Sequence, residues 1–178
     1  GNLYVASSNF KLTRPRGDIF ILRKMPDGAY AARESLLGNI GLTNGLFYDN
    51  AQNRIFFSNT IGGVYSFVPG ERSFREEYLK LHFTEACDDL CTDIGGNIWM
   101  TDPGHSTVKV FNPGTGCLVR FMVAGVGQTS SCRIRQEDGH EILYLTELKS
   151  ENKVSKDVSD GRRVLIIPAK EMLKLARR

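Results

Sequence analysis

The sequence has no long apolar run, no strong excess of one charge and no segment that resembles a targeting signal. A membrane-spanning helix needs roughly 20 consecutive apolar residues, and no stretch of the chain approaches that length. The 23 Lys and Arg residues against 20 Asp and Glu leave a net charge of +3. Because the basic residues are mostly scattered, we expect neither nucleic acid nor a membrane as a partner. The chain opens on Gly1 rather than Met, so we expect the natural N-terminus to lie upstream.

Cysteine is scarce and forms no recognised pattern. The four cysteines show neither C-x-x-C nor zinc-finger spacing, and are Cys87, Cys91, Cys117 and Cys132. We expect them to be small buried residues, since free cysteine is among the most buried residue types. The sequence also has no N-x-S/T acceptor for N-glycosylation. Both absences favour a reducing, cytoplasmic location.

Two common kinds of enzyme site are also missing. There is no G-x-S-x-G motif, and the chain has only three histidines, so serine-hydrolase chemistry is not expected. No phosphate-binding glycine loop is present either, because the Gly62/Gly63 and Gly95/Gly96 pairs are typical of turns between strands.

Four similar segments are the strongest signal in the sequence. Each has a turn, a short apolar strand and a small hydroxyl residue, and three of them continue with Asn, Asp or Glu. They are residues 1–7, 53–59, 96–102 and 140–147. The equivalent residues Leu3, Ile55, Ile98 and Ile142 lie 52, 43 and 44 positions apart. This period suits the four-stranded blade of a β-propeller.

The repeat predicts an all-β chain of about four propeller blades in one domain. The predicted blades are residues 1–41, 42–85, 86–127 and 128–168, with 169–178 as a C-terminal helix or tail. In each blade we expect an inner strand, a second strand that returns beside it, and two further strands. The first blade lacks its inner strand. Closing the ring therefore requires an N-terminal segment of roughly 100 or more residues, or a second chain.

This topology predicts a site at one end of the ring. The start of each inner strand and the loop after each second strand lie at the same end. The polar residues expected there include Asn44, Asp88, Asp89, His105, Thr129 and Ser130. Carboxylate and amide oxygens suit a hard cation such as Ca²⁺, and Asn44 and Asp88 come from neighbouring blades. Structural alternatives stay open: Asn44 suits a turn, Asp88 and Asp89 suit a solvated or turn-capping pair, and His105 suits an ordinary loop histidine.

At these residues the chain resembles the regucalcin–gluconolactonase family of metal-dependent, six-bladed propellers. Asn44 lies in T-N-G-L, which is similar to the family's metal-binding S/T-N-G-L. Asp88 lies in C-D-D-L, before G-N-I-W-M, where the family has P-D-G-L/M followed by G-N/K-L-W-V. The segment T-S-S-C-R from Thr129 is similar to the family's T-S-C-C-F.

The resemblance implies that Asn44 and Asp88 bind the metal and that Asp88 is also catalytic. The family's other ligands, a glutamate and a second asparagine, belong to upstream blades that this chain does not contain. Asp89 departs from the family, because it replaces a glycine and adds a charge beside Asp88.

The first functional hypothesis is a metal-dependent hydrolase of a small-molecule lactone or related ester. A divalent cation, with Ca²⁺ preferred over Zn²⁺ or Mg²⁺, would polarise the carbonyl and activate water. Asp88 would bind the cation and act as general base, and His105 would serve as an acid, base or substrate contact. Thr129, Ser130 and Asp89 are the expected substrate-binding residues.

Two alternatives remain open. A biosynthetic cyclase could use the same channel, with Asp88, Asp89 or His105 assisting proton transfer. A non-catalytic binding scaffold would instead use the long loop over residues 147–162 as its contact surface. Many functions share one propeller scaffold, so the fold does not choose among them.

Overall fold

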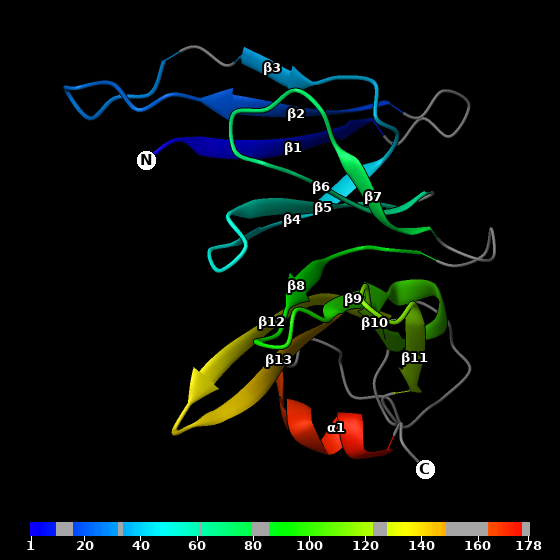
Figure 1. The fold of residues 1–178 in the computed structure, drawn as a ribbon. Helices are drawn as coiled ribbons and strands as arrows, with labels where there is room; N and C mark the ends of the chain where they lie inside the picture. The colour runs from blue at the N-terminus through cyan, green and yellow to red at the C-terminus, as the bar shows by residue number, and fades with distance from the viewer. Residues whose placement is uncertain are drawn as a thin grey trace. The chain divides into compact units, whose positions relative to one another are not determined.

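The structure, a computed structural model, describes residues 1–9, 16–31, 34–60, 62–79, 86–122, 128–148 and 164–175. Among these residues the chain forms fourteen strands, one short 3-10 helix and one α-helix. The strands make four antiparallel sheets (Figure 1). The chain divides into two compact units, Gly1–Leu79 and Lys80–Arg178.

The first unit contains two sheets. One has the order β1 (Leu3–Asn9), β2 (Arg16–Leu22), β3 (Glu34–Leu37). The other has the order β4 (Thr43–Asp49), β5 (Arg54–Asn59), β6 (Gly63–Phe67), β7 (Arg75–Leu79). Strand β1 lies against β4, and side chains from both sheets, among them Ile19, Ile21, Phe57 and Phe67, form one buried core.

The second unit also contains two sheets. Its first sheet consists of β8 (Leu90–Thr92), β9 (Ile98–Asp102), β10 (Thr107–Asn112) and β11 (Cys117–Met122). Its second sheet consists of β12 (Gln128–Glu137), β13 (His140–Leu148) and β14 (Val164–Pro168), followed by α1 (Ala169–Leu175). The 3-10 helix η1 (Pro103–His105) joins β9 to β10, and β12 packs against both β8 and β9.

The all-β, blade-like class predicted from the repeat is confirmed, including the short C-terminal helix. Each sheet is a meander in which neighbours in sequence pair, and each falls inside one predicted blade range. The first sheet has three described strands and begins with β1, the predicted second strand of its blade. A single domain over the whole chain stays a prediction. No helix in the described ranges is long and apolar enough to cross a membrane.

Aspartates shape the turns that join inner and second strands. Asp49 accepts hydrogen bonds from the N–H groups of Ala51 and Gln52, at 2.9 and 3.0 Å. Asp93 accepts from the Asn97 N–H at 2.9 Å and from the Trp99 indole at 2.9 Å. Trp99 is fully buried and belongs to the core. These aspartates therefore serve the fold.

The cysteine prediction is correct at three positions and wrong at one. Cys87, Cys91 and Cys132 are buried, whereas Cys117 is exposed because it starts the outer strand β11 after a turn. The thiol of Cys91 lies 3.8 Å from that of Cys132. Hydrogen bonding with Cys91 and burial raise the pKa of Cys132 well above its ordinary value, so this thiol stays protonated at neutral pH.

Candidate functional site

One hydrogen bond recurs at the start of three inner strands. In each blade a hydroxyl near the end of the second strand accepts a main-chain N–H of the inner strand, and we name this contact the hydroxyl clamp. The pairs are Gly45 with Ser58 at 2.7 Å, Asp89 with Thr101 at 3.0 Å, and Ser131 with Thr146 at 2.9 Å. The clamp explains the small hydroxyl residue that the second, third and fourth repeats carry at this point.

The clamp places three of the predicted site residues at equivalent positions. Asn44, Asp88 and Ser130 each come one residue before a clamped N–H group. The pairing register shifts next to Asn44 and Ser130, in β4 and β12, and such bulges redirect side chains near functional sites. Asn44 belongs to the first unit and Asp88 to the second, so a cation shared between them stays a prediction.

Within the second unit, the predicted residues gather at one end. The N–H of Asp88 donates to the Thr101 carbonyl at 3.0 Å, which places Asp88 beside the end of β9. The η1 helix that carries His105 follows directly and packs against β12. Thr101 Oγ1 also donates to the Ser130 carbonyl at 3.0 Å. The structure therefore brings Asp88, His105 and Ser130 to the same end of this unit, as the topology predicted.

Thr129 lies at this end as well, but its hydroxyl is directed into the fold. Thr129 is fully buried, and its Oγ1 donates to the Thr107 carbonyl at 2.9 Å. The hydroxyl of Ser130 is 2.9 Å from that of Thr146 and is partly accessible. Ser130 is thus better placed than Thr129 for contact with a ligand, and both substrate roles stay predictions.

Asp88 has the most perturbed carboxyl at this end. Its side chain is half-buried. The loss of water around it, with a smaller contribution from the neighbouring charge of Asp89, raises the pKa to about 6. Both causes act by penalising the ionised form, so Asp88 is a carboxylate that a cation would stabilise.

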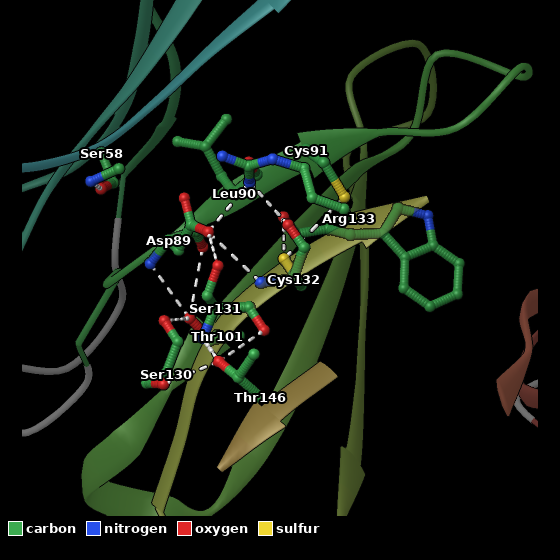
Figure 2. Close-up of polar contacts among 12 residues, drawn as sticks. Ser58, Asp89, Leu90, Cys91, Thr101, Ser130, Ser131, Cys132, Arg133 and Thr146 are labelled. Carbon is green, nitrogen blue, oxygen red and sulfur yellow. Dashed lines mark hydrogen bonds and ion pairs between the residues drawn. The ribbon is translucent and has the colours of Figure 1, made fainter. Parts of the chain in front are cut away.

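Asp89 is the centre of a polar network that joins two inner strands (Figure 2). Its Oδ2 accepts a hydrogen bond from the hydroxyl of Ser131, another from the N–H of Cys132 at 3.3 Å, and an ion pair from Arg133 at 2.9 Å. The same Arg133 nitrogen also donates to the Leu90 carbonyl at 2.9 Å. Asp89 is 8% exposed. It holds β8 against β12, and its predicted contact with substrate remains untested.

The partner of Asp89 was missed by the sequence reasoning, although a signal existed. Asp89 and Arg133 are 44 residues apart, which is the repeat period. Both are departures from the resembled family, which has glycine and phenylalanine at these positions. The structure brings the Asp89 carboxylate and the Arg133 guanidinium into direct contact at 2.9 Å.

Replacing Arg133 with alanine is expected to reduce the free energy of unfolding by about 1–3 kcal/mol, because a buried carboxylate loses a charged donor. Restoring the family-like pair, D89G with R133F, should recover most of that loss. Arg135, exposed on the same strand, is the matched control, and R135A should change stability by less than about 0.5 kcal/mol. Urea denaturation measures all three, and equal effects of R133A and R135A would contradict the expectation.

A second cluster surrounds Asp102, at the end of β9. Its Oδ2 lies 3.1 Å from His105 Nδ1 and 3.3 Å from Lys109 Nζ. The side chain of His105 is 46% exposed, whereas those of Asp102 and Lys109 are 2% and 0% exposed. The buried Asp102 therefore orients the accessible imidazole of His105. Lys109 was not predicted as part of any site.

Two further results concern metals and the long loop. The part of the chain that the structure describes contains no group of three or more His, Cys, Asp and Glu side chains arranged to hold a metal ion. The proposed partner-binding loop over residues 147–162 lies outside the described residues, apart from its first two positions.

Comparison with known proteins places the fold. No family model matches the chain, and no curated protein sequence matches it. Among solved structures, the calcium-binding protein regucalcin from Agrobacterium tumefaciens matches with a TM-score of 0.71 and 17% identity, over 94% of this chain and 57% of its own. A luciferin-regenerating enzyme matches with a TM-score of 0.66 and 16% identity, over 95% of this chain and 58% of its own.

A gluconolactonase from Xanthomonas campestris matches with a TM-score of 0.59 and 21% identity, over 83% of this chain and 50% of its own. The chain therefore spans about half the length of the structures that it matches. At these identities the comparison establishes the fold, a partial β-propeller. The similarity to regucalcin and gluconolactonase that the sequence motifs predicted is confirmed at that level.

Proposed function

We propose that the full-length protein hydrolyses a small lactone or related ester in a reaction that depends on a divalent cation. The observation that carries the proposal is Asp88, whose half-buried carboxyl has a pKa raised to about 6 and stands at the start of an inner strand. The fold that presents it is shared with a gluconolactonase and with the calcium-binding regucalcin.

The residues of this chain fit a hard divalent cation. Burial and the charge of Asp89 both oppose ionisation of Asp88, and a bound cation would offset both. The carboxylate of Asp88 and the amide oxygen of Asn44 are ligands of the type that Ca²⁺ takes. Mg²⁺ and Zn²⁺ also accept carboxylate oxygens, so Ca²⁺ is the first choice rather than the only one.

When bound, a divalent cation would polarise the lactone carbonyl and lower the pKa of water. Side chains of this protein would carry out the proton transfers. The carboxylate of Asp88 is suited to accept a proton from the attacking water. His105 is held through Nδ1 by the buried Asp102 at 3.1 Å, which leaves Nε2 to exchange a proton with a substrate oxygen. Ser130 would contact the substrate through its hydroxyl.

Cation binding should depend on pH in a direction set by Asp88. Below about pH 6 the carboxyl is protonated, and a cation must displace that proton. We therefore expect affinity for Ca²⁺ to fall about tenfold per pH unit below 6 and to level off above it. Calcium titrations by calorimetry between pH 5 and 8 measure this. D89N removes one cause of the raised pKa and should move the midpoint lower, whereas a flat profile would contradict the assignment.

The proposal is tested with the full-length protein and a panel of γ- and δ-lactones, including sugar lactones. We expect hydrolysis that stops on treatment with a chelator and returns on addition of Ca²⁺, Mg²⁺ or Zn²⁺. Unchanged hydrolysis after complete metal removal would refute cation dependence. Absence of hydrolysis across the panel, with or without metal, would favour the cyclase or the binding scaffold instead.

A further inference from the structure

A fully buried ion pair contacts the segment that leads to Asp88. Lys109 of β10 and Asp102 at the end of β9 are 0% and 1% exposed, with Nζ 3.3 Å from Oδ2. The two residues share one face of the sheet, because Asp102 pairs with Thr107 and Lys109 lies two positions further along β10. Such diagonal neighbours on antiparallel strands are within reach of a long side chain.

This ion pair is poorly arranged for stability alone. Removing both charges from water costs several kcal/mol per ion, and only complete hydrogen bonding compensates for that cost. Asp102 Oδ2 contacts both Lys109 Nζ and His105 Nδ1. Its other oxygen, Oδ1, is buried and has no hydrogen-bond partner among the described residues. Apolar side chains of similar volume at such positions are often neutral or stabilising, so the pair calls for a reason other than stability.

The ammonium group reaches past Asp102 to the chain that leads into β8. Lys109 Nζ donates to the Ala86 carbonyl at 2.8 Å and lies 4.0 Å from Cys87 Sγ. Two residues later, the N–H of Asp88 donates to the Thr101 carbonyl at 3.0 Å. Lys109 and Thr101 thus hold the main chain on the approach to Asp88 and at Asp88 itself.

The preceding four-stranded sheet performs the same task with different chemistry. Asn59 follows the clamp residue Ser58 as Asp102 follows Thr101. The Asn59 side-chain amide donates directly to the Ile40 carbonyl at 2.7 Å, in the segment that leads into β4 and Asn44. A carboxylate cannot donate such a bond. In the second unit the donor is Lys109, and Asp102 neutralises its charge.

We propose that Lys109 and Asp102 are a positioning pair that fixes the Ala86–Asp88 main chain, so that the Asp88 carboxylate is presented to a divalent cation. The inference rests on the proposed function, because it takes Asp88 as a cation ligand. Groups that do not touch the metal but orient one of its ligands affect metal affinity strongly. Their loss typically weakens metal binding about 10–100-fold.

Two double variants of the full-length protein separate positioning from folding. D102V/K109M removes both charges and the donor to Ala86, whereas D102N/K109M removes both charges but keeps an amide donor like that of Asn59. Calorimetric titration with Ca²⁺ alone gives the affinity, and thermal unfolding gives the stability. D88N serves as the reference for loss of the ligand itself.

We expect D102V/K109M to unfold within a few degrees of the wild type and to bind Ca²⁺ at least tenfold more weakly. D102N/K109M should regain most of that affinity. A folded D102V/K109M with wild-type affinity, beside a D88N variant that has lost binding, would overturn the positioning role. Failure of D102V/K109M to fold would assign the pair to the fold and overturn it as well. If D88N itself binds Ca²⁺ like the wild type, the metal assignment in the proposed function is at fault.

Discussion

Replacing Asp88 with asparagine is expected to lower kcat/KM for lactone hydrolysis by about 10²–10⁴-fold, the usual contribution of a general base. The amide keeps the size of the side chain but carries no charge for a cation and accepts no proton from water. The clamp uses the main-chain N–H of Asp89, and Asp88 itself bonds to Thr101 through its N–H, so the sheet should fold normally. Steady-state kinetics on the full-length protein measure the effect.

The control for this substitution is Asp138. It lies in the exposed turn between β12 and β13 with φ 48°, and asparagine tolerates that conformation well. D138N should therefore retain wild-type kinetics and stability. Wild-type kinetics in D88N, with an intact cation dependence, would show that another residue carries the chemistry.

Replacing Trp99 with alanine is expected to destabilise the protein by about 3–5 kcal/mol. The side chain is fully buried, stacks on Phe121 with ring centroids 6.4 Å apart, and donates its indole N–H to Asp93 at 2.9 Å. Alanine leaves a cavity and removes the donor from a buried carboxylate. Urea or thermal denaturation measures the loss.

Two further variants divide the contribution of Trp99. W99F keeps most of the apolar volume but lacks the donor, so it should lose less than W99A, with the cost of the unpaired Asp93 at about 1–3 kcal/mol. I94A removes an apolar side chain that is 83% exposed in the turn next to Asp93 and should leave stability almost unchanged. A W99A variant as stable as I94A would contradict the role of Trp99 in the core.

The features that recur with the repeat could be predicted from the sequence. Strand positions, the turn roles of Asp49 and Asp93, and the equivalence of site positions all follow from four aligned copies of one pattern. Repetition helps prediction because each copy is independent evidence for the same local structure. The small hydroxyl was visible in every copy, and in the second, third and fourth copies the hydroxyl clamp supplies its physical reason.

The features that occur in only one copy were not predicted. Lys109 lies in an alternating strand where a lysine normally faces water, and only the pairing of β10 with β9 shows that it reaches Ala86. Arg133 contacts Asp89 because β12 packs against β8. No local sequence pattern specifies this packing between two sheets. The exposed Cys117 follows from strand order, since it starts the outermost strand of its sheet.

The hydroxyl clamp also bears on how such a protein can change over time. A clamp that grips a main-chain N–H places no demand on the side chain one residue earlier, and in this chain that position holds Asn44, Asp88 and Ser130 in turn. Natural variation can therefore change this one position in each blade while the sheets stay the same. In this chain the position already carries an amide, a carboxylic acid and an alcohol.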